Sequence, residues 1–271
     1  MDNRPIGIFD SGLGGLTALT ALQELLPREN IVYFADGARV PYGGRRASQL
    51  RKMAVQDLGL LASFQPKAII VACGTLSSTA PDILEGYPLP VFGVVRPALR
   101  ALCAMPGDGP IGVIATEASI RSGAYKRGLL EARGELEVID LPCPKFVPLI
   151  ESGHTDREDP LLRAAVESAL APLKMVGVSA LLLGCTHYGL IADAIRDFLG
   201  DGVELVSASG CAARELTDYL RENELEGGDG DVRFFTSGSA PDFRRAASVL
   251  LRLDSLSVGH VPMAEVADDD G

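Results

Sequence analysis

The feature that most constrains the fold is an alternation of short apolar segments with amphipathic segments, which occurs twice along the chain. Continuous apolar runs of about four to eight residues are typical of strands buried on both faces, whereas the longer segments repeat their leucines at helical spacing. Strands that alternate with helices predict a parallel sheet covered by helices on both sides. The first half has predicted strands at 5–12, 31–36, 68–75 and 91–95, and predicted helices at 14–27, 47–64 and 77–85.

The second half repeats this order. Asp10 ends the first strand of the first half and Cys73 ends its third, and Thr116 and Cys185 hold the same two places in the second half. The halves therefore correspond strand for strand. They predict two doubly wound α/β domains with parallel sheets, related by a pseudo-twofold axis, with the active site in the cleft between them. The strands of this half are predicted at 110–119, 136–143, 180–187 and 203–207, and its helices at 124–133, 159–173 and 190–199.

The remaining segment contains one predicted helix, one strand and one helix, which is too little for a domain of its own. We therefore expect it to return and complete the first half. The acidic end of the chain has the composition of a disordered tail. The predicted division is a first domain of 1–96 plus 212–262, a second domain of 97–211, and a tail of 263–271.

Two cysteines are predicted to meet in the cleft. Ligands of open parallel sheets bind beyond the carboxyl ends of the strands, so domains that face each other by those ends bring Cys73 and Cys185 together. A single base cannot easily return a proton to the opposite face of a stereocentre, whereas two groups on opposite sides can. With each sulfur about 3–3.5 Å from the carbon, the pair would lie roughly 7 Å apart. This arrangement predicts proton transfer at a stereocentre by two thiols, one of which abstracts while the other donates.

A thiol has an ordinary pKa of about 8.5 and needs help to become a thiolate. The start of a helix after each strand favours the thiolate. His187 can assist Cys185, and Asp10 can assist Cys73. A substrate carboxylate has hydroxyls and loop amides available, from Ser11, Thr75, Thr186 and the glycine-rich segment 11–15.

An alternative stays open for each of these two cysteines taken singly. A cysteine that ends an apolar strand is often a small buried hydrophobic residue, and we assign this role to Cys103 and Cys211. Cys143 lies between two prolines, which suggests a shaped turn.

Composition excludes several other functions. The net charge of −11, from 25 basic and 36 acidic residues, argues against a nucleic-acid surface and against binding to anionic lipid. We find no signal peptide and no apolar run near the roughly 20 residues that cross a bilayer, and with five widely spaced cysteines we expect reduced thiols in the cytoplasm. The sequence has no C-x-x-C pair of the kind that would indicate a zinc site.

Cofactors are also not expected. The segment "DSGLGG" has Thr17 where the dinucleotide fingerprint needs its third glycine, and no phosphate-binding P-loop motif is present. Pyridoxal phosphate needs a Schiff-base lysine. Only Lys145 lies near a predicted strand end, without a phosphate loop beside it, so we reject this cofactor.

Taken in order, "GIFDSGLGGLTAL", "PYGGR", "IIVACGT", "PCPKFVPLIESG", "LLLGCTHY" and "FFTSGS" resemble the motifs of bacterial glutamate racemases, over about residues 6–250. The resemblance implies a cofactor-independent cytoplasmic enzyme that supplies D-glutamate for peptidoglycan and forms homodimers. It implies that Cys73 and Cys185 are the catalytic thiols, one for each enantiomer, assisted by Asp10 and His187, with Glu151 a further candidate. The residues implied to hold the substrate are Ser11, Pro41, Tyr42, Gly43, Gly74, Thr75, Thr116 and Thr186.

The sequence departs from this pattern at four positions. Gly74 follows the first cysteine where the family has an asparagine whose amide binds substrate. If the missing amide is the defect, Gly74→Asn is expected to raise kcat/KM; no change would mean that the loop is compensated elsewhere. Arg96 stands where a glutamate is usual, Gly189 replaces a proline, and Ser207 lies near a common aspartate.

Two alternatives remain open beside glutamate racemisation. The altered "CGT" segment favours a racemase for another amino acid such as aspartate. A racemase-like binding protein with little turnover is the other; Gly74 and Arg96 motivate it, and the two retained cysteines argue against it.

Overall fold

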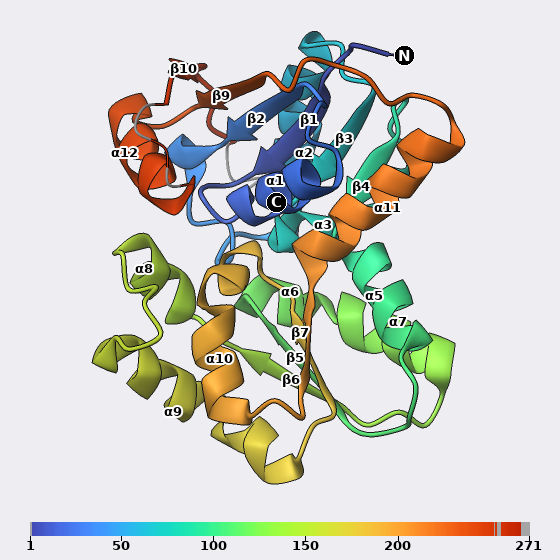
Figure 1. Ribbon diagram of the computed structural model, residues 1–271, viewed down its shortest axis with the longest axis vertical. Coiled ribbons are helices and arrows are strands. Elements are labelled where there is room, and N and C mark those ends of the chain that lie inside the picture. Colours follow the sequence, from blue (N-terminus) through green and yellow to red (C-terminus); the bar gives the residue numbers. More distant parts are fainter. Residues whose placement is uncertain (1, 252, 254–255, 267–271) are drawn as a thin grey trace.

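The chain forms two parallel sheets, one in each half of the molecule in Figure 1, in a computed structural model that describes residues 2–251, 253 and 256–266. The first sheet has the strand order β10-β9-β2-β1-β3-β4. Every pairing in it is parallel. Its strands are β1 (Ile6–Asp10), β2 (Ile31–Ala35), β3 (Ala68–Val71), β4 (Val91–Gly93), β9 (Val232–Thr236) and β10 (Val258–His260).

The second sheet has the order β6-β5-β7-β8 and is also parallel throughout. Its strands are β5 (Ile111–Ala115), β6 (Val138–Pro142), β7 (Ala180–Leu183) and β8 (Glu204–Ser207). This order matches β2-β1-β3-β4 of the first sheet, strand for strand. The predicted fold class of two parallel-sheet α/β domains is therefore confirmed.

Helices cover both sheets. The α-helices are α1 (Leu16–Leu25), α2 (Ala47–Ser63), α3 (Gly74–Thr79), α4 (Pro81–Glu85), α5 (Val95–Ala104), α6 (Glu117–Ser122), α7 (Ala124–Arg133), α8 (Phe146–Glu151), α9 (Pro160–Val176), α10 (Ala192–Leu199), α11 (Ala208–Glu222) and α12 (Ala240–Leu251). Two 3₁₀ turns, η1 (Gly37–Arg39) and η2 (Thr186–Ile191), follow strand ends. None of the helices within the described ranges has the length and apolar character that a membrane span requires.

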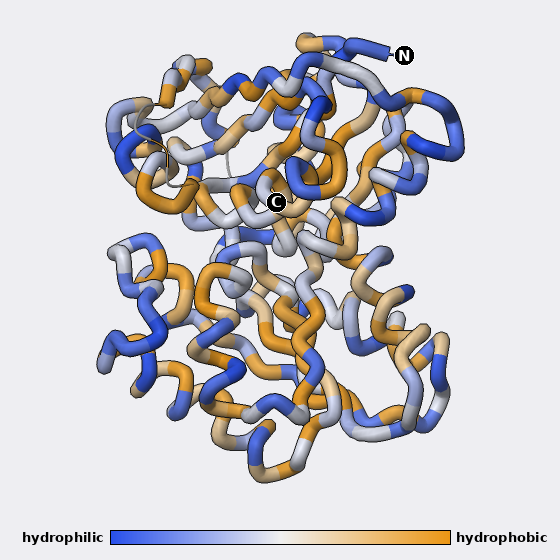
Figure 2. The backbone as a smooth tube through the Cα atoms, in the orientation of Figure 1, coloured by the Kyte–Doolittle hydropathy of each residue, from blue (hydrophilic) through white to orange (hydrophobic). Residues whose placement is uncertain are grey.

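Strand residues alternate between two buried cores, which explains why each strand is apolar along its whole length. In β3, Ile70 points to one core whereas Ile69 and Val71 point to another, under α2. In β7, Leu182 and Leu181 divide in the same way. Figure 2 shows the resulting apolar strands inside a polar exterior.

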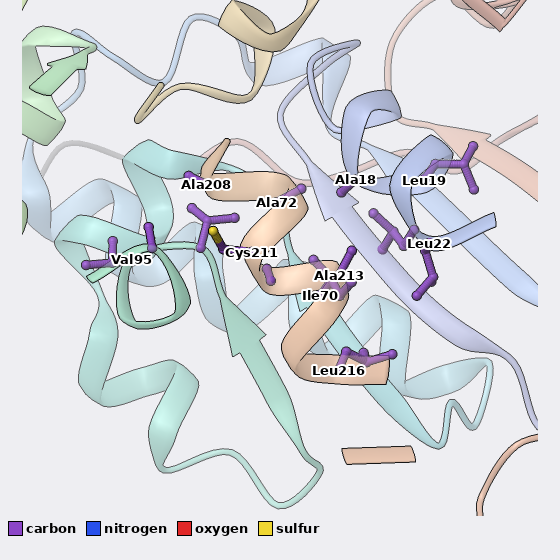
Figure 3. Close-up of a cluster of buried hydrophobic side chains, with 14 of the residues drawn as sticks. Ala18, Leu19, Leu22, Ile70, Ala72, Val95, Ala208, Cys211, Ala213 and Leu216 are labelled. Atoms are coloured by element: carbon purple, nitrogen blue, oxygen red, sulfur yellow. The ribbon is translucent and has the colours of Figure 1, made fainter. Parts of the chain in front are cut away.

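One of these cores is common to both domains, and we call it the shared core. It contains Ile70 of the first sheet and Leu182 of the second, joined by α1, α5, α7 and α11. Figure 3 shows α11 packed beside α1 and β3, with Ala208, Cys211 and Leu216 among the buried residues. Small side chains let α11 lie close to its neighbours, while burying a leucine contributes about 1.5–3 kcal/mol. The domains are therefore joined by apolar packing as well as by the chain.

The predicted domain boundaries fall inside two of these joining helices. The division at 96/97 lies in α5 and that at 211/212 lies in α11, so both crossings between the sheets are helical. The segment after α11 adds β9 beside β2, and it adds β10, a strand that was not predicted.

The predicted disordered tail is wrong for 263–266. Val266 is 8% exposed and packs in the core under α2, and the carbonyl oxygen of Ala264 accepts a hydrogen bond of 3.1 Å from Arg39 Nη1. Acidic composition predicted disorder, but apolar side chains at Met263 and Val266 pack here. Residues 267–271 of the predicted tail lie outside the described residues.

Candidate active site

The site lies where the strand order reverses in each sheet. In the first sheet the chain leaves β1 for β2 on one side and returns to β3 on the other, and β5, β6 and β7 repeat this path. Ligand sites of doubly wound folds lie at such switch points, beyond the carboxyl ends of the strands. Asp10 and Cys73 therefore end neighbouring strands of one domain, and Thr116 and Cys185 follow neighbouring strands of the other.

A cavity of about 420 Å³ lies between the two switch points. All of the predicted site residues except Asp10 line it. They are Ser11, Pro41, Tyr42, Gly43, Cys73, Gly74, Thr75, Thr116, Glu151, Cys185, Thr186 and His187. The strand ends of both domains thus form a single site.

On the second domain's side, three groups form a chain. His187 Nδ1 lies 3.8 Å from Cys185 Sγ, and His187 Nε2 lies 3.1 Å from Glu151 Oε1. Burial lowers the pKa of His187, but its hydrogen bonds with Cys185 and Glu151 outweigh burial and raise the pKa to about 10. The imidazole is therefore charged at neutral pH, and a charged imidazole beside a sulfur favours the thiolate.

On the first domain's side, Cys73 has a different environment. It caps α3, is 4% exposed, and its thiol donates to Ser11 Oγ at 3.8 Å. Burial raises the pKa of Cys73 well above its ordinary value, and the charge of Asp10 acts in the same direction. Cys73 is therefore a protonated thiol at neutral pH. Cys73 has no cationic neighbour comparable to His187 beside Cys185.

Asp10 lies beneath the cavity and connects the domains. Its carboxylate accepts hydrogen bonds from the Gly12 amide at 2.8 Å and from Thr186 Oγ1, across the cleft, at 3.2 Å. Burial raises the pKa of Asp10, and the nearby charge of His187 opposes this shift. Asp10 thus acts on Cys73 and His187 through charge rather than through a direct hydrogen bond.

Hydroxyls of the two domains also meet across the cleft. Thr75 Oγ1 and Thr116 Oγ1 are 2.9 Å apart, and Ser78 Oγ donates to Ser119 Oγ at 3.2 Å. Ser78 and Ser119 were not among the predicted residues. They continue the contact between α3 and α6 behind the two threonines.

Gly74 permits a close approach of the two domains beside Cys185. A Cβ atom added to Gly74 would lie 2.4 Å from the backbone oxygen of Gly184, the residue before Cys185. Real Cβ atoms do not approach this closely, so a side chain at position 74 requires one of the two backbone segments to shift. The prediction that Gly74→Asn raises kcat/KM if a missing amide is the defect stays a prediction, and the close contact with the Gly184 carbonyl opposes it.

The cavity also contains residues that sequence reasoning missed. Cys143 is 2% exposed, and burial raises its pKa to about 12. The two prolines that flank it suggested a turn, and the following α8 is short and contains Pro148, so no helical pattern indicated that this segment lines the site. The missed lining residues are Val40, Gly44, Glu117, Cys143, Pro144, Val147, Pro148 and Tyr188.

The other departures lie farther from the chemistry. Arg96 makes an exposed ion pair of 3.1 Å with Glu85, and Ser207 caps α11 by accepting a hydrogen bond from the Gly210 amide. Gly189 faces Thr17 across the cleft. Among the described residues, no group of three or more His, Cys, Asp or Glu side chains is placed to hold a metal ion.

Comparisons with known proteins agree on one family. The family model described as Asp/Glu/Hydantoin racemase matches residues 19–216. Glutamate racemase of Lactococcus lactis subsp. lactis is 37% identical over 265 residues, which cover 96% of each chain. Glutamate racemase 2 of Caldanaerobacter subterraneus subsp. tengcongensis is 36% identical over 254 residues, covering 93% of this chain and 94% of the relative.

Solved structures are similar over almost the whole chain. Glutamate racemase isoform RacE1 of Bacillus anthracis matches with a TM-score of 0.90 and 33% identity, covering 97% of this chain and 99% of that one. The glutamate racemase of Francisella tularensis subsp. tularensis, solved in complex with D-glutamate, matches with a TM-score of 0.87 and 34% identity, covering 96% and 98%.

Proposed function

Because this chain belongs to the Asp/Glu/Hydantoin racemase family and is an amino-acid racemase, we propose that it interconverts L- and D-glutamate with two cysteines and without a cofactor. The observation that carries the proposal is the single cavity lined by Cys73 from one domain and Cys185 from the other. Glutamate is the substrate named for relatives that align over nearly the full chain, and D-glutamate is bound in one of them.

The charged His187 beside Cys185, and the protonated thiol of Cys73, suggest an order of events for this proposal. Cys185, beside the charged His187, starts as the thiolate and removes the α-proton, while Cys73, a protonated thiol, donates a proton to the opposite face of the carbon. After one turnover, Cys185 is a protonated thiol and Cys73 is a thiolate. This state is competent for the reverse reaction, so each cysteine serves one enantiomer. Glu151 keeps His187 charged and oriented through Nε2.

The substrate is held by the remaining predicted residues in this proposal. Ser11, Thr75, Thr116 and Thr186 offer hydroxyls. Tyr42, Gly43 and Gly74 offer backbone amides, and Pro41 offers its ring and its carbonyl oxygen. The similarity to glutamate racemases further leads us to propose a role in supplying D-glutamate for peptidoglycan, in the cytoplasm, with the enzyme acting as a homodimer.

Proton NMR in heavy water tests the proposal directly. The purified protein, with reduced thiols, is incubated with L-glutamate and separately with D-glutamate, and the α-proton signal and enantiomer ratio are followed. We expect loss of the α-proton and growth of the opposite enantiomer from both. Absence of exchange with glutamate in a folded protein would overturn the substrate assignment, and L- and D-aspartate run in parallel would identify a racemase of different specificity.

Single cysteine variants test the mechanism. Cys73→Ser and Cys185→Ser should each abolish racemisation, because a serine hydroxyl is far less acidic than a thiol, and each should impair proton abstraction from one enantiomer in particular. Cys103→Ser, at a half-buried cysteine outside the cavity, is the matched control. Normal turnover in either site variant would contradict the two-thiol mechanism.

A further inference from the structure

Arg39 is the largest side chain that is fully buried in the described part of the chain. It belongs to η1, which follows β2 and precedes the substrate loop, residues 40–44. An arginine is rarely buried unless every donor has a partner, since an unpaired buried charge costs several kcal/mol. Because Arg39 lies next to the cavity, its hydrogen-bond partners can affect the geometry of the substrate loop.

The guanidinium contacts three elements at once. Nε donates to Asp36 at 2.6 Å, Nη2 donates to Asp57 of α2 at 2.6 Å, and Nη1 donates to Gln56 and to the carbonyl oxygen of Ala264 at 3.1 Å. The planar fork of arginine can make these bonds in fixed directions, which lysine cannot. Arg39 thus ties the end of β2 to α2 and to the C-terminal segment.

The same carboxylates hold the substrate loop. The hydroxyl of Tyr42 is hydrogen-bonded to Asp36 and, at 3.1 Å, to Asp57, although its ring lines the cavity. The Tyr42 hydroxyl therefore faces Arg39's partners and not the substrate. The backbone oxygen of Arg39 also accepts two hydrogen bonds from the Arg45 side chain, at 3.0 and 2.7 Å, beyond the far end of the loop.

Asp36 connects this network to β1, the strand that ends at Asp10. Its side chain accepts a hydrogen bond of 2.6 Å from Ser237, and its amide donates to the carbonyl oxygen of Asp10 at 3.0 Å. The network thus spans β1, β2 and the end of β9. It meets the substrate loop on one side and residues 263–266 on the other.

We propose that Arg39 is a positioning residue that fixes the substrate loop from beneath, by clamping Asp36 and Asp57 so that they hold Tyr42, with the C-terminal segment completing the clamp through Ala264. The proposal rests on the proposed function, because the loop matters only if it binds substrate. Arg39 itself does not line the cavity. Its effect on the reaction passes through residues 40–44.

Arg39→Lys tests the proposal, with Lys67→Met as the matched control. Lys67 is also a buried cation: it pairs with Glu29 at 2.5 Å and donates to three backbone oxygens. It precedes β3, at the amino ends of the strands, whereas the cavity lies at their carboxyl ends. We expect Arg39→Lys to raise KM for glutamate about 5- to 50-fold, as for one or two lost hydrogen bonds, with kcat changed less than about threefold. Lys67→Met should lower the unfolding midpoint and leave KM unchanged.

Amide hydrogen exchange gives a readout that does not need turnover. Arg39→Lys should speed exchange in residues 42–45 at least about tenfold relative to the rest of the chain, whereas Lys67→Met should not. Unchanged KM and unchanged loop exchange in a folded Arg39→Lys protein would overturn the proposal, leaving Arg39 a residue of general stability. If Arg39→Lys does not fold, Tyr42→Phe, which removes only the hydroxyl, must show the same rise in KM and in loop exchange for the proposal to stand. If the wild type does not racemise glutamate, the proposed function fails, and the exchange result still decides whether Arg39 clamps the loop.

Discussion

Replacing Gly74 is the sharpest perturbation of the site, because Gly74 contacts the opposite domain beside Cys185. In Gly74→Ala, the new Cβ would lie 2.4 Å from the backbone oxygen of Gly184. An ordinary contact between carbon and oxygen is about 3.3–3.6 Å. The two segments must therefore move apart by about 1 Å. Neither segment can yield by rotating a side chain, since the atom met is a backbone carbonyl.

The shared core resists this separation. Ile70 and Leu182 belong to one apolar cluster that runs through both domains, so the cleft cannot widen without disturbing packed side chains. In the proposed mechanism both sulfurs must reach the same carbon, and a misplacement of about 1 Å costs about 100-fold in rate. We therefore expect Gly74→Ala to lower kcat/KM about 100-fold, which corresponds to about 2.7 kcal/mol of transition-state stabilisation.

The assay is enantiomer-resolved turnover of L- and D-glutamate, together with the unfolding midpoint in urea. Gly59→Ala is the control, because Gly59 is an exposed position within α2 where an added Cβ meets nothing within 4 Å. It should keep full activity and gain up to about 1 kcal/mol of stability from helix propensity.

Two results would refute this reasoning. If Gly74→Ala racemises glutamate within twofold of the wild type, the close approach at Gly184 does not set the distance between the thiols. If Gly74→Asn raises kcat/KM, the domains open without cost and a missing amide limits the enzyme, as the sequence alone had suggested.

Four further predictions concern charge, the cleft and the core. Glu151→Gln should lower the pKa of His187 from about 10, seen by NMR titration of the imidazole; a wild-type value near 6.5 would contradict the charged state. Since the folded pKa of His187 lies above its unfolded value, its stabilisation should be complete below about pH 6.5 and lost as pH rises toward 10, measured as urea midpoints against pH. Thr75→Val should lower the free energy of unfolding by about 0.5–1.5 kcal/mol and weaken glutamate binding, because Thr116 loses a hydrogen-bond partner across the cleft. A Kd for glutamate that is unchanged by calorimetry would contradict this prediction. Leu216→Ala in α11 should lower the free energy of unfolding by about 2–5 kcal/mol. A smaller loss, measured by urea unfolding, would contradict tight packing of the shared core.

Much of the fold could be predicted because strands buried on both faces are apolar throughout, and their ends then locate the site. The correspondence of β1, β2 and β3 with β5, β6 and β7 was predicted from the repeated alternation, and it brought Cys73 and Cys185 to one cavity. Short elements escaped prediction: β10 has three residues and a glycine, and α8 contains a proline. Their stability comes from tertiary packing, which carries no periodic signal.

The buried charges also escaped prediction, for a different reason. Arg39 and Asp57 are polar residues in a chain with many exposed charges, and nothing local distinguishes them from surface residues. Asp57 lies on the buried face of α2 only because Arg39 reaches it from another element. Pairing of this kind depends on the packing of elements that are distant in the sequence.

Departures from the family pattern can now be ranked by where they act. Arg96 makes an exposed pair with Glu85, and pairs of this kind contribute about 0–1 kcal/mol, so this charge reversal has little leverage on catalysis. Gly74 changes no charge, yet it touches the backbone that carries Cys185. If Cys73 and Cys185 are the reacting groups, as we propose, the distance between them is set by the contacts between the two domains. A small residue at such a contact therefore affects the chemistry more than a reversed charge at the surface.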